Sequence, residues 1–184
     1  MSETLTEDCP AVQPYELPAA ADYGLRSQVE RFLCYDAELL DAYRLLDWMR
    51  LVTPDFQYCM PVRNNIDSLD LDAAFSERAF HMIEDYGSLN ARMKRLVGGL
   101  AWSEKPPSRI RRHVSNIRVA PPGGEEIGVR SNLLFFWGRD ETSATISAER
   151  RDTLRLIDGR LYLAQRHVLL DHLSIPIPNL SVVL

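Results

Sequence analysis

The apolar residues follow a helical period in the first half of the chain and a strand-like period in the second half. From Ser27 onward they recur every three or four residues, which predicts an amphipathic helix that starts with the capping pair Ser27 and Glu30. A second short helix is predicted over residues 43–51, and a third over 82–97. Gly98-Gly99 is predicted to end the third helix by adopting left-handed backbone. The apolar residues of the first helix are Val29, Phe32, Leu33, Ala37, Leu40 and Tyr43, and those of the third are Met82, Tyr86, Leu89, Met93, Leu96 and Val97.

Strands are predicted where apolar residues alternate with polar ones. Residues 56–60 alternate in this way and are expected to form a strand that ends at Pro61, followed by a polar surface loop over residues 64–76. From Ile110 onward the chain is strand-like, and residues 129–137 carry apolar side chains on both faces, so both faces are expected to be covered. The turns Pro121-Pro122-Gly123-Gly124 and Asp158-Gly159 separate these strands.

Helices followed by an antiparallel meander predict an α+β fold in which the early helices pack on a curved sheet. The 184 residues, 46% of them hydrophobic, suit a single domain over residues 25–184 that buries about 70% of its unfolded surface. Residues 1–24 hold three prolines and five acids without a base, so they are expected to form an extended acidic arm. The apolar segment 173–184 either completes the core or lies in a subunit contact, and we expect the contact.

Charge and cysteine usage limit the partners and the compartment. The net charge of −5 resides entirely in the acidic arm, and a neutral body does not resemble a nucleic-acid-binding surface. The three cysteines are an odd and sparse set, which does not suit a disulfide framework. The sequence has neither a secretory leader nor an apolar run of about 18 residues. We therefore expect a cytoplasmic protein that does not contact membranes.

One cationic stripe stands out against the neutral body. Between Arg92 and Arg112 there are seven cationic residues and a single acid, and the rigid Pro106-Pro107 pair precedes three arginines. Arginines form two-bond pairs with carboxylates, so the stripe is a candidate surface for a partner protein, although partners within the chain would explain it as well. Trp102 is a candidate anchor or a core residue. The predicted interface residues are Trp102, Pro106, Pro107, Arg109, Arg111 and Arg112, together with Asn179, Leu180 and Leu184 of the apolar tail.

The chain shows no motif of its own for metal or nucleophilic chemistry. The cysteines are 25 residues apart, and the histidines lack metal-site spacing; His167 and Asp171 would share a strand face, with His172 on the other. The sequence has no GxSxG, Walker or GxGxxG motif. Asp36, among apolar neighbours on the first helix, has two interpretations. It is either a carboxyl with a raised pKa for proton transfer or the partner of an arginine on the sheet, and we favour the ion pair.

Several segments of the chain are informative when taken together and in this order: residues 35–41, Trp48, residues 58–63, 102–116, 129–132, 150–155 and 179–181. Together they resemble the small (β) subunit of aromatic-ring-hydroxylating dioxygenases. The similarity extends from about Ser27 to the C-terminal residues. Asp36 stands where that family more often has glutamate, and Cys34 where it often has an aromatic residue.

The resemblance implies a cone-shaped fold like those of nuclear transport factor 2, scytalone dehydratase and ketosteroid isomerase, also described as cystatin-like. It implies a trimer of β subunits beneath three α subunits. The α subunit would hold the Rieske [2Fe-2S] cluster and the mononuclear Fe(II) that cis-dihydroxylate an aromatic hydrocarbon. This chain would then be a structural subunit without a cofactor or catalytic residue. The alternatives are a stand-alone dehydratase or isomerase that uses Asp36, Tyr58 or His113 inside the cone, and a small-ligand binding module.

Overall fold

A computed structural model describes residues 22–98 and 107–184, except residues 68, 71, 179, 181 and 182. Six strands form one sheet in the order β2-β1-β6-β5-β4-β3, with antiparallel neighbours except for the parallel pair β1 and β6. The elements are α1 (Tyr23–Asp41), α2 (Leu45–Trp48), η1 (Met49–Leu51), β1 (Val52–Arg63), η2 (Asp72–Ala74), β2 (Phe75–Asp85), α3 (Tyr86–Val97), β3 (Arg109–Val119), β4 (Glu126–Arg139), β5 (Thr142–Ile157) and β6 (Arg160–Leu170).

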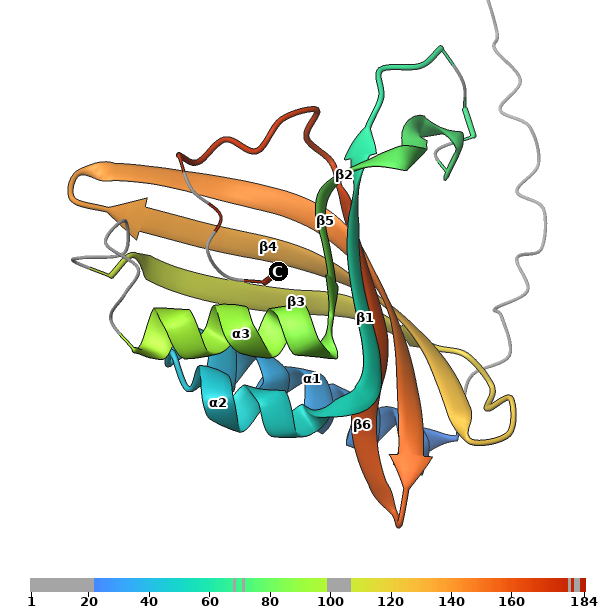
Figure 1. Cartoon of the computed structure of the whole chain (residues 1–184). Helices are drawn as coiled ribbons and strands as arrows, with labels where there is room; N and C mark the ends of the chain where they lie inside the picture. Colours follow the sequence, from blue (N-terminus) through green and yellow to red (C-terminus); the bar gives the residue numbers. More distant parts are fainter. Residues whose placement is uncertain (1–21, 68, 71, 99–106, 179, 181–182) are drawn as a thin grey trace, which may run out of the picture.

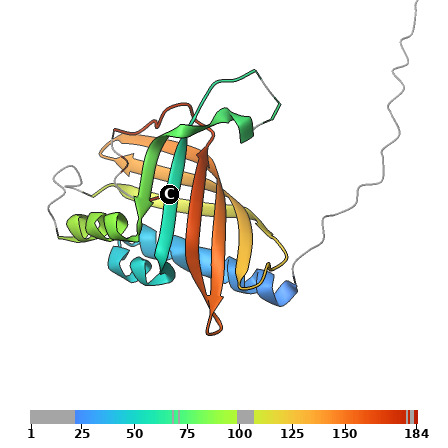
Figure 2. The same ribbon diagram turned by 45° about the vertical axis from the view of Figure 1, so that its right-hand side comes forward.

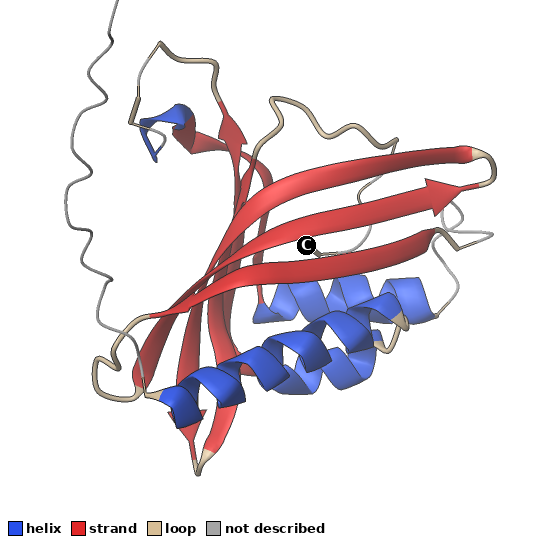
Figure 3. Ribbon diagram, turned by 180° about the vertical axis from the view of Figure 1, so that it is seen from behind, coloured by secondary structure: helices blue, strands red, loops and turns tan. Residues whose placement is uncertain are grey.

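The sheet curves around the helices, as the sequence predicted. Figure 1 shows α1, α2 and α3 together on one side of the curved sheet, and Figure 2 shows α1, in blue, passing behind the lower part of the strands. Seen from behind, α1 lies along β3, the edge strand (Figure 3). The apolar sides of the helices and the inner face of the sheet form one core, which includes Leu33, Trp48, Phe56 and Phe135. In the described part of the chain, no helix has the length and apolar character needed to span a membrane.

Helix α1 follows the predicted apolar stripe but begins earlier than predicted. Val29, Leu33 and Leu40 are fully buried, as a core-facing stripe requires. The helix begins at Tyr23, and Asp22 at the N-cap position makes no side-chain capping bond, so the predicted start at Ser27 was wrong. The first residues of α1 thus lie within the segment predicted to be an extended arm. Residues 1–21 of that arm lie outside the described part of the structure.

Strand β2 was missed, because its residues were assigned to a surface loop and to the start of the third helix. It is an edge strand whose side chains are mostly exposed, so its alternation of apolar and polar residues is weak. Met82, predicted to be helical, pairs with Met60 of β1. The helix α3 starts only at Tyr86, where Asp85 and Ser88 form a reciprocal capping box. Gly98 ends α3 with φ −69°, so the predicted left-handed backbone is absent there, and Gly99 lies outside the described residues.

Strand β1 is longer than predicted and contains Pro54 as well as Pro61, which was predicted to end the strand. The preceding helical turn ends at Leu51, before Pro54. Pro61 lies inside β1, where the pairing with β2 shifts register between Met60 and Pro61. A proline has no N–H to donate to a neighbouring strand, so its placement at an irregularity in the ladder is expected.

The long strand β4 shows which face of the sheet is buried by the rest of the subunit. Along β4, every second residue from Ile127 to Trp137 is buried, whereas Leu134 and Phe136 on the other face are 49% and 38% exposed. The expectation that both faces are covered was therefore wrong within this chain. The predicted Asp158-Gly159 hairpin between β5 and β6 is confirmed, with φ 49° and 74°.

The apolar tail completes the core of its own subunit. Ile177 is 8% exposed, and Val183 and Leu184 are fully buried in the same cluster as the sheet residues. In Figure 1 the C-terminal end is seen beside the labels of strands β3 and β4, above the helices. The preferred expectation of a subunit contact for this tail is corrected at these three residues, because their side chains already have apolar neighbours within the chain.

Candidate functional sites: the interior of the cone and the cationic strand

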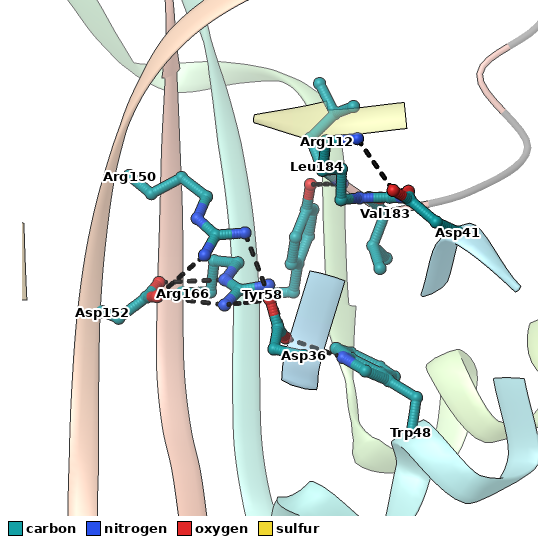
Figure 4. Close-up of polar contacts among 10 residues, drawn as sticks. All are labelled: Asp36, Asp41, Trp48, Tyr58, Arg112, Arg150, Asp152, Arg166, Val183 and Leu184. Atoms are coloured by element: carbon teal, nitrogen blue, oxygen red, sulfur yellow. Dashed lines mark hydrogen bonds and ion pairs between the residues drawn. The ribbon is translucent and has the colours of Figure 1, made fainter. Parts of the chain in front are cut away.

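The polar centre of the cone is the carboxylate of Asp36, which α1 presents to the inner face of the sheet. The Trp48 indole Nε1 donates to its Oδ1 at 2.8 Å. Arg166 donates to both carboxylate oxygens at 3.1 and 3.2 Å, and Arg150 donates to Oδ2 at 3.3 Å. Figure 4 shows these side chains converging from α1, α2, β5 and β6. Both oxygens of a fully buried carboxylate are thus held by donors of the same chain.

A second carboxylate, Asp152, completes the network on the sheet side. Arg166 donates to it through Nε at 2.9 Å and Nη2 at 3.0 Å, and Arg150 Nη2 lies 3.9 Å from its Oδ2. Asp152 and Arg166 are directly opposite each other on β5 and β6, so the strand register sets this pair. Asp36, Asp152, Arg150 and Arg166 form a neutral cluster of two acids and two bases, with nearly complete burial of every side chain. We call these four residues and Trp48 the interior network.

The charges of the interior network hold Asp36 ionised. Burial alone would raise the pKa of Asp36, but Arg166, Arg150 and the Trp48 N–H outweigh it and lower this pKa to about 2. Burial also lowers the pKa of Arg150, whose Nε and Nη2 have no hydrogen-bond partner. The pKa of Arg166 is raised because Asp152 and Asp36 together outweigh its desolvation. The favoured prediction for Asp36, an ion pair with arginines of the sheet, is confirmed, and the alternative of a carboxyl with a raised pKa is wrong.

A neighbouring set of contacts closes the interior around the tail. Arg112 Nη1 donates to Asp41 Oδ1 at 2.6 Å, its backbone N–H donates to Oδ2 at 2.9 Å, and its Nη2 donates to the carbonyl of Val183. The Arg112 guanidinium also lies over the Phe135 ring, 5.0 Å from its centroid. Asp41 thus joins the end of α1 to the edge strand β3, and Arg112 joins both to the tail (Figure 4).

Tyr58 is the other interior residue that sequence reasoning had offered as an acid or base. Its hydroxyl accepts the backbone N–H of Leu184 at 3.2 Å, and burial raises its pKa to about 12. The third residue of that proposal, His113, is exposed on the opposite face of β3 from Arg112. The structure therefore brings Asp36 and Tyr58 into the interior but not His113. Near neutral pH, the carboxylate is already ionised and the phenol holds its proton, so neither group is tuned for proton transfer.

The cationic stripe is divided between the two faces of β3. Arg112 points inward and is buried, so it is not the surface residue that was predicted. Arg111 points outward with 68% of its side chain exposed, and its Nη1 lies 3.9 Å from Asp41 Oδ2. Arg109 is also exposed and donates to the backbone carbonyl of Asp140 at 2.9 Å. The alternation of a strand separates these arginines although they are close in sequence.

The other predicted interface residues are placed as follows. Pro107 is exposed and Leu180 is partly buried against the core, whereas Leu184 is fully buried. Trp102, Pro106 and Asn179 lie outside the described residues, so their predicted role stays a prediction.

Sequence reasoning missed four of the five residues of the interior network. It singled out Asp36 but neither Trp48 nor the sheet residues Arg150, Asp152 and Arg166 as its partners. The available signal was the pair Arg150 and Asp152, two residues apart on a strand whose other inward residues, such as Leu154, are apolar. Charged residues in an apolar series are found buried when they pair with each other.

Groups of three or more potential metal ligands (His, Cys, Asp, Glu) are absent from the described part of the chain. His167 is half-buried on β6, and its pKa is lowered by burial and by Arg151. Asp171 accepts from the Ser147 hydroxyl at 2.6 Å, and His172 Nε2 accepts from the Ser147 backbone N–H at 3.2 Å. These side chains are thus engaged in protein contacts around the end of β6.

Comparison with known proteins agrees with this architecture. Residues 35–176 match the sequence profile described as "Ring hydroxylating beta subunit". The chain is 33% identical over 162 residues to the small oxygenase component of the p-cumate 2,3-dioxygenase system of Pseudomonas putida, which covers 86% of this chain and 88% of the relative. It is 30% identical over 172 residues to the biphenyl 2,3-dioxygenase subunit beta of Rhodococcus jostii, which covers 89% of this chain and 91% of the relative.

Solved structures show the same fold. A chain of naphthalene 1,2-dioxygenase superposes with a TM-score of 0.77 at 22% identity, over 90% of this chain and 88% of that chain. A protein from Novosphingobium aromaticivorans assigned as a scytalone dehydratase superposes with a TM-score of 0.60 at 14% identity, over 81% of this chain and 85% of that chain. At these identities the likeness concerns the fold alone. The profile match and the sequence relatives carry the assignment: the chain belongs to the family of ring-hydroxylating dioxygenase β subunits.

Proposed function

We propose that this chain is the structural β subunit of an α3β3 dioxygenase whose α subunits cis-dihydroxylate an aromatic hydrocarbon. The observation that carries the structural role is the filled interior of the cone. In that interior the carboxylate of Asp36 is held by three donors, and the tail residues Val183 and Leu184 are fully buried. A site for an organic substrate needs convergent polar groups that remain available to the substrate, and these groups are engaged with each other.

The relatives support an aromatic substrate for the complex. Those named above belong to dioxygenases of p-cumate and biphenyl, and another relative, 32% identical over 170 residues, is the β subunit of a benzene 1,2-dioxygenase from Pseudomonas putida. These compounds share an unactivated benzene ring but differ in size and charge. We therefore propose a substrate with a benzene ring, bound by the α subunit.

The cofactors of the reaction are assigned to the partner. We propose that the α subunit holds the Rieske [2Fe-2S] cluster and the mononuclear Fe(II), and that this chain contributes the base on which three α subunits assemble. We also propose a cytoplasmic location, supported by Cys34 and Cys59, which are free thiols as expected for a reducing compartment.

The alternative of a stand-alone dehydratase or isomerase draws on fold similarity, such as the likeness to the dehydratase-like protein. The interior chemistry disfavours it. A general base that works near neutral pH needs a pKa near that pH, whereas the pKa of Asp36 is lowered to about 2 and that of Tyr58 is raised to about 12. The same contacts disfavour a small-ligand binding module, because the tail occupies the interior.

The proposal is tested by producing the chain with and without the α subunit of its host. Native mass spectrometry of the joint preparation is expected to give a complex of three copies of each chain. After the chains are separated, iron and acid-labile sulfide are expected only with the α chain. The joint preparation should oxidise benzene or biphenyl when supplied with electrons from a reduced nicotinamide through a reductase and ferredoxin. The proposal fails if the isolated chain is a stable monomer that transforms a substrate unaided, or if iron and sulfide remain with this chain.

A further inference from the structure

The outer face of the sheet carries an exposed surface that combines apolar and cationic residues. Phe136 and Leu134 of β4 are 38% and 49% exposed. In the strand ladder, Arg111 lies directly opposite Phe136, and Arg109 lies opposite Gly138. The Phe136 ring and the Arg109 guanidinium both lie over Gly138, where an added Cβ would be 3.2 Å from the ring and 3.5 Å from Arg109 Nη2. We call Arg109, Arg111, Leu134 and Phe136 the aromatic–arginine patch.

This patch has the composition of a protein interface. Aromatic residues and arginine are enriched at the cores of protein interfaces. The guanidinium group of arginine is weakly hydrated and can stack on an aromatic ring, so its burial in an interface costs less desolvation than burial of an ammonium group. Arg109 and Arg111 are only partly engaged by contacts with the described residues: Arg109 Nη2 donates to a backbone carbonyl, and Arg111 Nη1 lies 3.9 Å from a carboxylate oxygen. The carboxylate of Asp41 is mainly engaged by Arg112. The patch can therefore accept further carboxylates.

A second exposed surface of the same chain is complementary in charge and also apolar. The loop between β1 and η2 carries Asp67, and its apolar residues Ile66 and Leu69 are 38% and 101% exposed; Asp72 follows the loop as the first residue of η2. The base of the loop is held in place, because Asn64 N–H donates to the Ala74 carbonyl at 2.7 Å and Asp72 pairs with Arg151 at 2.6 Å. We call Ile66, Asp67, Leu69 and Asp70 the acidic loop. The loop therefore exposes the aliphatic side chain of Leu69 near the carboxylate of Asp67, and its two ends are anchored to the rest of the subunit.

The two surfaces are far apart within one subunit. Figures 1 and 3 show the loop beyond the ends of β1 and β2, while the β4–β5 hairpin, next to which the patch lies, extends away from it on the other side of the molecule. The patch and the loop can therefore meet only between two molecules. A contact between two different surfaces of one protein is heterologous, and repetition of such a contact closes into a ring when the rotation permits.

We propose that the acidic loop of one copy docks on the aromatic–arginine patch of the next copy, and that this contact joins the β subunits into a ring. The inference rests on the proposed function, which requires three copies around a common axis. It assigns the outer face of β3 and β4 to a neighbouring copy of this chain and not to the α subunit. Leu69 would lie against Leu134 and Phe136, and Asp67 would face Arg109 or Arg111. Burial of these apolar side chains at each contact around the ring would favour assembly.

A crosslinking experiment on mixed copies tests the contact directly. In a background without Cys9, Cys34 and Cys59, one copy carries Leu69→Cys and another carries Leu134→Cys, and the two are assembled together with the α subunit. A short bismaleimide is expected to give a crosslinked β dimer only in the mixture. The matched control replaces Leu134→Cys by Leu173→Cys, since Leu173 is 55% exposed but lies outside the patch. The proposal is overturned if the mixture gives no more dimer than the control while the complex has its full mass.

A variant that disrupts the patch distinguishes its two possible partners, a second β copy and the α subunit. Leu134→Asp places a charge on an exposed strand position, and circular dichroism and denaturation check that the subunit still folds. We expect native mass spectrometry to show at least a tenfold loss of complexes with more than one β chain, while one-to-one αβ pairs persist. Loss of α with retention of β oligomers would assign the patch to the α subunit and overturn the proposal, as would unchanged stoichiometry. If the wild-type chain binds no α subunit, the proposed function fails, and β–β crosslinking without α still tests the contact.

Discussion

Arg111 and Arg112 are neighbours in sequence, but one side chain is exposed and the other is buried. The Arg112 side chain is fully buried, where it bonds Asp41 and the Val183 carbonyl, whereas 68% of the Arg111 side chain is exposed. The same chemical group thus joins the helix, the sheet and the tail at one position and remains available to a partner at the next. The cationic stripe that appears uniform in the sequence therefore consists of two sets, one buried in the fold and one exposed at the surface.

The energetics of the two sets differ for a physical reason. Buried charges that lose their partner leave an uncompensated charge in a medium of low polarity, which costs about 3–5 kcal/mol. Exposed pairs exchange one well-solvated state for another and contribute about 0–1 kcal/mol. Substitutions in the interior should therefore change the stability of the subunit, and those on the outer face should change its association.

The largest effect is expected at the centre of the interior network. Asp36→Asn removes the charge that Arg150 and Arg166 share, and should lower the free energy of unfolding by about 3–5 kcal/mol. The control is Glu38→Gln, an exposed carboxylate on the same helix, which should change it by no more than about 0.5 kcal/mol. Urea denaturation followed by tryptophan fluorescence measures both. Equal stability of the two variants would contradict the structural role of the network.

A direct comparison of the neighbouring arginines should give the next largest effect. Arg112→Met leaves Asp41 and the Val183 carbonyl without their donor, and should lower the free energy of unfolding by about 3 kcal/mol. Arg111→Met should change it by less than about 0.5 kcal/mol, because Arg111 is exposed and its contact is long. Thermal denaturation of the two variants side by side provides the measurement. If Arg111→Met were the more destabilising change, the assignment of the two faces would be wrong.

Acid should weaken the interior network within a defined pH window. The pKa of Asp36 is lowered from 3.8 to about 2, so its stabilisation is complete above about pH 4 and is lost as the pH falls through 2. Between pH 5 and pH 2 the free energy of unfolding should fall by on the order of 2 kcal/mol from this group. Urea denaturation curves recorded at both pH values measure the change. The Asp36→Asn variant should lose less stability over this range than Glu38→Gln does. An identical slope for both would show that other carboxylates govern acid unfolding.

The smallest effect on the subunit itself is expected at the outer arginines. Arg109→Ala should leave the unfolding curve unchanged and weaken assembly by about two- to fivefold, since one exposed charge contributes at most about 1 kcal/mol to an interface rim. The dependence of assembly on salt should also decrease, because a charge at the contact is removed. Analytical ultracentrifugation over a range of salt concentrations measures both properties. Assembly as tight and as salt-dependent as in the wild type would place Arg109 outside any contact.

Local elements with clear periods and turn signals could be predicted from the residue pattern alone. Val29, Leu33 and Leu40 recur at helical spacing and lie in the core, and Asp158-Gly159 forms its hairpin, because these patterns depend on residues close in the chain. The cone fold and the family also followed from the sequence. Strand β2 did not, because an edge strand with mostly exposed side chains has little alternation, and its pairing partner β1 is a separate segment.

The use of the charged residues, by contrast, depends on contacts that form only when the chain folds. Asp36 meets Arg166 across 130 positions, and Arg112 meets Asp41 across 71, so no local pattern encodes these pairs. Which face of β3 and β4 is buried depends on the side of the sheet that the helices and the tail cover. That choice placed Arg112 in the interior and left Arg111 and Phe136 exposed. The physical reason is that burial and pairing arise from segments brought together by folding, whereas sequence periods report only on each segment alone.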